Sequence, residues 1–107
     1  MTQGPVRAGS AVARVDRRVA VPGTGLPVVE YRPDPTTGVP VLLIHENRGL
    51  VRSMHDIASA LASHGHPVVM PDLLGRVGGT DPQGSPDTTT RVIPTPTHVD
   101  DLVAVYD

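Results

Sequence analysis

Apolar residues follow one another without alternation in one short stretch, Val-Leu-Leu-Ile at 41–44. Such an unbroken run is typical of a strand buried on both faces of a parallel sheet, so it predicts a strand of this kind over residues 39–46. Polar residues then follow, from His45 through Glu46, Asn47 and Arg48 to Gly49. Open α/β sheets bind ligands just beyond the carboxyl ends of their strands, which makes this stretch the first candidate for chemistry.

The residues before this run predict an antiparallel hairpin. Spaced valines indicate a strand over 11–21, with a solvent-facing side that carries Arg14, Asp16 and Arg17. Pro22-Gly23-Thr24-Gly25 is a turn signal, and residues 26–32 form the second predicted strand. Residues 1–10 contain Gly, Pro and Ser and are expected to be disordered.

The strongest helix signal covers residues 53–64. Ser53, with Asp56 three residues later, predicts a capping box at its start, and Gly65 suits the position just after its end. One apolar face has helical spacing and consists of Met54, Ile57, Ala58 and Leu61. An apolar strand over 67–71 follows, so strand, helix and strand form a βαβ unit, which strongly prefers the right-handed crossover.

The remaining residues predict a long connection and then a helix. Residues 72–97 are rich in Gly, Pro, Thr and Asp, and Asp72 is expected to end the preceding strand in an Asx-type turn. Residues 98–107 resemble the first turns of a helix whose apolar face holds Val99, Leu102, Val103, and Val105 or Tyr106. The pattern stops without a C-cap. Doubly wound α/β domains often need about 200–250 residues, so this chain of 107 is expected to be half of one.

Composition narrows the function classes. The net charge of −2 gives no reason to expect nucleic acid or an anionic membrane as a partner. The chain has no Cys, which excludes a disulfide scaffold, a Cys-based metal site and a Cys nucleophile among its own residues. No segment has the length of a membrane span and residues 1–21 lack the apolar core of a signal peptide, so a cytoplasmic protein is expected.

Two motifs carry a resemblance to a known family. His-Glu-Asn-Arg-Gly-Leu at 45–50 and Pro-Asp-Leu-Leu-Gly-Arg-Val-Gly-Gly-Thr at 71–80, in this order and spacing, resemble the dienelactone hydrolase family of the α/β-hydrolases. The resemblance covers residues 11–107 and implies the N-terminal half of that domain, an antiparallel hairpin followed by a βαβ unit of a mostly parallel sheet. It implies truncation before the Gly-x-Cys-x-Gly-Gly nucleophile elbow, so the Cys, Asp and His of the family's triad are not in this chain.

The resemblance also implies roles for three residues. Glu46 matches the glutamate that helps to activate the nucleophile, and Asn47 matches the residue whose backbone N–H forms half of the oxyanion hole. Arg76 matches the arginine that holds a substrate carboxylate. The complete enzyme would act on a small ester or lactone, and no cofactor or metal is implied.

Each of these residues also has a structural interpretation. Glu46 could pair with Arg48, and Arg76 could be a solvated surface residue. His45 is expected to be a hydrogen-bonded core residue rather than a catalyst, His64 and His66 fit a helix end without a metal ion, and His55 and His98 are expected at the surface. A non-catalytic module or a truncated gene product, which associates with itself through residues 41–45 as an open sheet edge, is the alternative to the enzyme.

Overall fold

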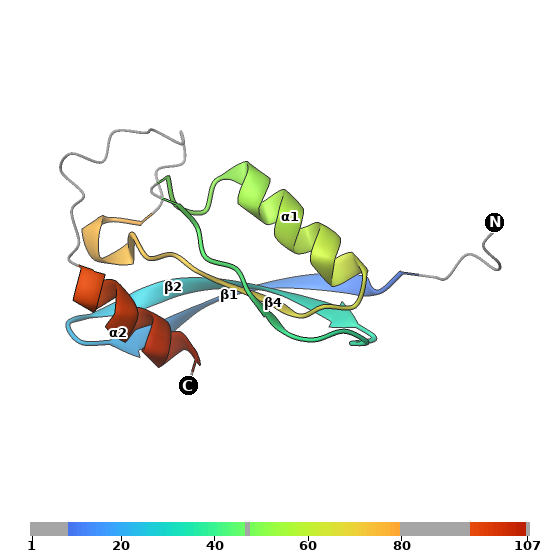
Figure 1. The fold of residues 1–107 in the computed structure, drawn as a ribbon, viewed down its shortest axis with the longest axis horizontal. Coiled ribbons are helices and arrows are strands. Elements are labelled where there is room, and N and C mark those ends of the chain that lie inside the picture. Colours follow the sequence, from blue (N-terminus) through green and yellow to red (C-terminus); the bar gives the residue numbers. More distant parts are fainter. Residues whose placement is uncertain (1–8, 47, 80–94, 107) are drawn as a thin grey trace.

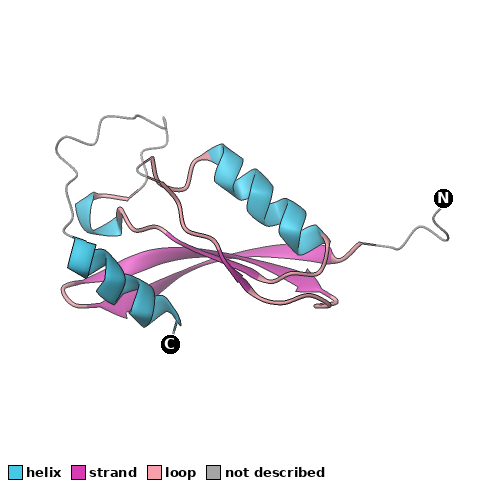
Figure 2. Ribbon diagram, in the orientation of Figure 1, coloured by secondary structure: helices cyan, strands magenta, loops and turns pink. Residues whose placement is uncertain are grey.

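The computed structural model describes residues 9–46, 48–79 and 95–106. Within these ranges the chain forms a four-stranded mixed sheet in the order β1-β2-β4-β3. Helix α1 (Arg52–Ser63) lies over one face of the sheet and helix α2 (Thr95–Tyr106) lies against the other (Figure 1; Figure 2). The result is the α/β arrangement that the sequence predicts.

The N-terminal hairpin confirms the predicted pair of strands. Strands β1 (Ala11–Val21) and β2 (Thr24–Asp34) pair antiparallel along their whole length, so β2 is longer at both ends than predicted. Pro22 and Gly23 form the turn, and Gly23 has a φ of +86°, which suits glycine at the second turn position. Of the predicted disordered segment, residues 1–8 lie outside the described part. Ser10 donates its backbone N–H to the Ser63 carbonyl at 3.0 Å.

The βαβ unit is present, but its first strand differs from the prediction. Strand β3 (Val41–Leu42) pairs in parallel with β4 (Val68–Pro71), and α1 connects them. The predicted strand over 39–46, buried on both faces, is wrong: Leu42 is 39% exposed and Ile44 is 50% exposed. The strand order explains this, because β3 is at the sheet edge and has β4 as its single neighbour in the described sheet.

Helix α1 has no side-chain cap at its N-terminus and a backbone capping motif at its C-terminus. Its N-cap is Val51, with no side-chain cap, so the capping box predicted from Ser53 is wrong. At its C-terminus, Gly65 has a φ of +96° and donates to the Ala62 carbonyl, while His66 donates to the Leu61 carbonyl. These two bonds form a Schellman motif and confirm the expected position of Gly65.

Two apolar clusters lie on opposite faces of the sheet. The first holds Val29 and Tyr31 of β2 with Ala58 and Ala62 of α1. The second holds Leu26 and Val28 of β2, Leu73 of the loop after β4, and Val105 of α2. The predicted apolar faces are confirmed in part. Met54, Ala58 and Leu61 of α1 pack on the first cluster, and Leu102 and Val105 of α2 pack on the second. Ile57, Val99 and Val103 are exposed instead, because the buried side of α1 extends to Ala62 and that of α2 to Asp101.

Candidate functional site

The carboxyl ends of β3 and β4 lie side by side and are joined through His45. Its Nε2 accepts the backbone N–H of Leu73 at 2.9 Å, and its Nδ1–H donates to the Glu46 carbonyl at 2.5 Å. The side chain is 4% exposed. This confirms His45 as a buried, hydrogen-bonded residue. Both ring nitrogens are occupied, so the ring has no lone pair available for a substrate proton.

The loop after β4 is fixed by Asp72. One carboxylate oxygen accepts the backbone N–H of Leu74 at 3.0 Å, which confirms the predicted Asx-type turn. The Asp72 backbone N–H donates to the Pro27 carbonyl of β2 at 2.8 Å. The Asp72 carboxylate also lies 4.0 Å from His45 Nε2. The two strand ends are therefore held as one unit, as a catalytic edge requires.

Glu46 begins a tight turn at this edge. Its carbonyl accepts the backbone N–H of Gly49 at 3.0 Å, and Gly49 has a φ of +83°. The side chains of Glu46 and Arg48 are exposed, and the described ion pairs do not include the alternative contact between them. Asn47 lies outside the described residues. The roles of Glu46 and Asn47 in catalysis stay predictions.

Arg76 lies in the short 3₁₀ helix η1 (Gly75–Val77) that follows β4. Its Nε and Nη2 donate to the two carboxylate oxygens of Asp101 at 2.9 Å and 2.8 Å, and its Nη1 donates to the Pro22 carbonyl at 2.7 Å. The hydrogen bond to Asp101 raises the pKa of Arg76. A substrate carboxylate would have to compete with Asp101, so the predicted substrate contact of Arg76 stays a prediction.

Asp101 is the residue of this region that sequence reasoning missed. Its side chain is 0% exposed, although it belongs to a pair of adjacent acidic residues that resembles a solvated helix face. One signal was available, because Asp101 precedes the buried Val105 by four positions and therefore shares its face of the helix. A carboxylate on the apolar side of a helix requires a buried partner.

Two of the other histidines also depart from expectation. His55 is half-buried, and the Tyr31 hydroxyl lies 2.8 Å from its Nδ1. Burial, followed by the charge of Arg14, lowers the pKa of His55. The Nδ1 of His98 is buried and has no hydrogen-bond partner among the described residues. His64 Nδ1 lies 2.9 Å from the Ala60 carbonyl at the end of α1. No group of three potential metal ligands occurs in the described ranges.

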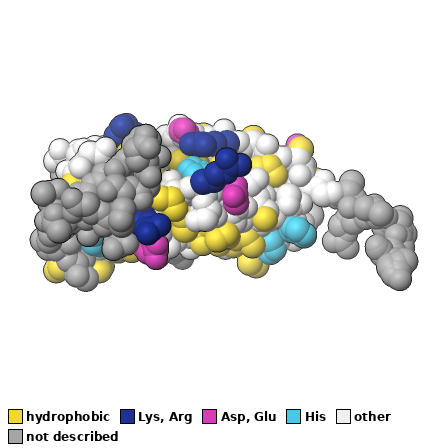
Figure 3. All heavy atoms as spheres, turned by 90° about the horizontal axis from the view of Figure 1, so that it is seen from above, with side chains coloured by type: hydrophobic (Ala, Val, Ile, Leu, Met, Phe, Trp, Pro, Cys, Tyr) yellow, Lys and Arg dark blue, Asp and Glu magenta, His cyan; other side chains and the backbone are white. Residues whose placement is uncertain are grey.

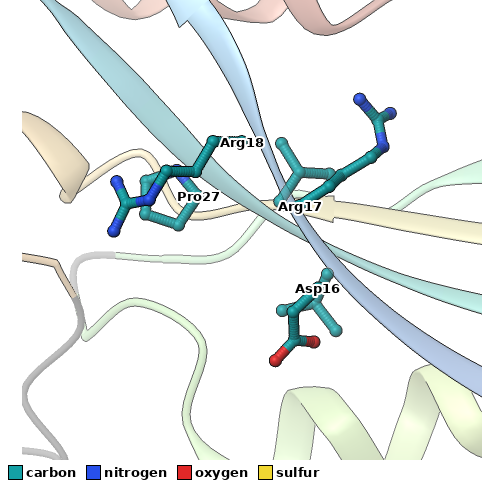
Figure 4. A pocket seen from close by; sticks show the side chains of 6 residues that line it. Asp16, Arg17, Arg18 and Pro27 are labelled. Atoms are coloured by element: carbon teal, nitrogen blue, oxygen red, sulfur yellow. The ribbon is translucent and has the colours of Figure 1, made fainter.

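A pocket of about 300 Å³ lies elsewhere, on the hairpin (Figure 4). Arg17 and Arg18 both line it but point in different directions, so their guanidinium groups do not converge on one ligand. Arg17 pairs with Glu30, and Arg18 donates to the Gly25 carbonyl at 2.9 Å. The face that carries α1 shows basic and acidic side chains among apolar ones (Figure 3). These features do not converge on a second site.

Comparison with known proteins gives a family and a fold for this chain. The model of the dienelactone hydrolase family matches residues 26–104. The chain belongs to this family. No curated protein matches it. Among solved structures, a proposed dienelactone hydrolase from Klebsiella pneumoniae subsp. pneumoniae MGH 78578 is 23% identical, with a TM-score of 0.70 over 89% of this chain.

This likeness gives the fold, a partial α/β-hydrolase fold. The chain spans 42% of the length of that dienelactone hydrolase relative. No helix of the described ranges is long and apolar enough to cross a membrane.

Proposed function

We propose that this chain is the N-terminal part of a cytoplasmic dienelactone-hydrolase-like enzyme that cleaves a carboxylic ester or lactone. The observation that carries the proposal is the family match across residues 26–104, which includes the joined ends of β3 and β4. The nucleophile would come from outside these 107 residues, which contain no Cys.

The proposed chemistry is acyl transfer. The nucleophile adds to the carbonyl carbon, the carbonyl oxygen becomes an oxyanion, the alcohol leaves with a proton, and water then releases the acid. The backbone N–H of Asn47 would donate to the oxyanion. Glu46 would accept the proton of the nucleophile, and its exposed side chain in the turn that follows β3 is accessible for this role.

Activity of the longer gene product tests this function. The coding DNA after Asp107 is read for a Gly-x-Cys-x-Gly-Gly run, and the longer product is assayed with p-nitrophenyl acetate beside this chain. We expect turnover by the longer product alone and a loss of about 100-fold or more in kcat on Glu46→Gln, the scale of acid–base catalysis. Arg48→Gln, an exposed neighbour, is the control and keeps full activity. Equal activity of the two variants, or turnover by the 107 residues alone, contradicts the proposal.

A second candidate function is association of two copies through β3. Val41 and Leu43 donate their backbone N–H groups to Pro67 and Val69, so the backbone groups of Leu42 and Ile44 point to the open edge. An exposed apolar edge strand recruits another strand. Leu42 of β3 also lines an apolar groove of about 280 Å³ together with Val99, Leu102 and Val103 of α2.

Light scattering tests this candidate. We expect a dimer that dissociates on Ile44→Lys, because a lysine at the edge opposes strand pairing. Ile57→Lys, at an equally exposed apolar position on α1, is the control and leaves the dimer intact. A monodisperse monomer at high concentration rules the candidate out.

A further inference from the structure

The ion pair between Arg76 and Asp101 closes the site that the family resemblance assigns to a substrate carboxylate. Arg76 is 21% exposed and Asp101 is 0% exposed, and two parallel hydrogen bonds join them. A guanidinium has two edges that can hold a carboxylate in this two-pronged way, Nε with Nη2 and Nη1 with Nη2, and Asp101 occupies the first of them. The remaining nitrogen, Nη1, donates to the Pro22 carbonyl.

Replacing Asp101 by a substrate carboxylate is unfavourable for two reasons. The Asp101 carboxylate would stay buried without its cation, which is the costly outcome when a buried pair is broken. The local charge also opposes a second anion, because Arg76 and Asp101 cancel and the exposed Asp100 adds a negative charge whose field reaches Arg76.

We propose that Asp101 is a specificity-determining residue that withholds Arg76 from substrate, so that the enzyme prefers esters or lactones with no carboxylate at this position. Asp101 acts through Arg76 and is therefore a positioning residue. This inference rests on the proposed hydrolase function for its substrate class. The closure of Arg76 to carboxylates is a property of the 107 residues and is measurable in them.

The binding test follows the Nε–H signal of Arg76 by NMR while acetate is added. We expect no saturable shift in the wild-type chain, a saturable shift in Asp101→Asn, and none in Asp101→Glu, which keeps a carboxylate. Asp100→Asn is the matched control, because it removes the adjacent exposed charge, keeps the pair, and stays unresponsive. Circular dichroism verifies that each variant is folded. A saturable shift in the wild-type chain overturns the inference, and so does a folded Asp101→Asn that ignores acetate.

The substrate test uses the longer gene product with two esters, p-nitrophenyl acetate and the mono-p-nitrophenyl ester of succinic acid. We expect a higher kcat/KM for the neutral ester, and Asp101→Asn raises the relative kcat/KM of the charged ester about tenfold, within the range for charge-assisted hydrogen bonds. Preference for the charged ester in the wild type overturns the inference. If neither ester reacts, the hydrolase proposal and the substrate class fail together, while the binding test still decides whether Asp101 closes Arg76.

Discussion

Replacing His45 perturbs the joint between β3 and β4 at a single atom. In His45→Ala, the buried Leu73 N–H loses its acceptor at 2.9 Å. An unsatisfied buried donor costs about 1–3 kcal/mol. A loss of about 2 kcal/mol corresponds to a fall in Tm of about 8–16 °C, since small domains lose about 4–8 °C per kcal/mol.

His45→Gln and His45→Asn separate the hydrogen bond from the loss of the ring. The Gln amide oxygen reaches the place of Nε2 and can accept the Leu73 N–H, whereas the shorter Asn does not reach it. We expect Gln to retain about 1 kcal/mol more stability than Asn, the net worth of one hydrogen bond.

Urea titration followed by circular dichroism gives the stabilities, which suits a chain without Trp. Amide exchange at Leu73 should accelerate in Ala and Asn but not in Gln. Equal stability of Gln and Asn refutes the reasoning, as does a ¹⁵N spectrum that places the proton of His45 on Nε2.

Three further predictions concern stability and its pH dependence. Gly65→Ala should lower Tm more than Gly78→Ala. Both glycines have a positive φ, which costs alanine about 1–2 kcal/mol at either position. A Cβ at Gly65 would also lie 2.0 Å from Thr37 Oγ1, whereas a Cβ at Gly78 would have no atom within 4 Å. Burial lowers the pKa of His55 below 6.5, so its contribution to stability is complete above pH 6.5 and declines as the pH falls through the lowered pKa. The urea midpoint of the wild-type chain should therefore fall across this pH range, and His55→Gln should show a smaller fall. Burial raises the pKa of Glu30, but hydrogen bonds from Arg32 and Arg17 outweigh this effect and lower the pKa below 4.5. The contribution of Glu30 to stability is therefore complete above pH 4.5 and is lost as the pH falls through the lowered pKa. Glu30→Gln should reduce the fall in urea midpoint at acid pH.

Local patterns were sufficient to predict most elements. The spaced valines of β1 and the Pro22-Gly23 turn indicate the hairpin through neighbouring residues, and Gly65 marks the end of α1 through its own backbone freedom. Burial of β3 on both faces was predicted wrongly, because an apolar run does not show which neighbours cover it in space. The open edge expected under the alternative interpretation agrees with the position of β3 in the described sheet. The N-cap of α1 was also predicted wrongly. Ser53 has a side chain suited to an N-cap, but the helix begins one residue earlier and Ser53 lies inside it.

The candidate site shows the same division. His45 was predicted to be buried because it continues an apolar run, and Asp72 to form its turn because that contact is local. The bond between Arg76 and Asp101 joins residues 25 positions apart, so spacing along the chain could not predict it. Arg76 was predicted to be a substrate contact or a solvated surface residue, and no prediction was made for Asp101.

Strand β2 separates the two apolar clusters with adjacent residues, Val28 on one side and Val29 on the other. A slip of one residue in its pairing would exchange these faces and remove apolar side chains from both clusters at once. The docking of α1 and the docking of α2 therefore depend on the same alignment of β2 with β1 and β4. A sheet in which β2 has the register that one helix requires therefore also has the register that the other helix requires.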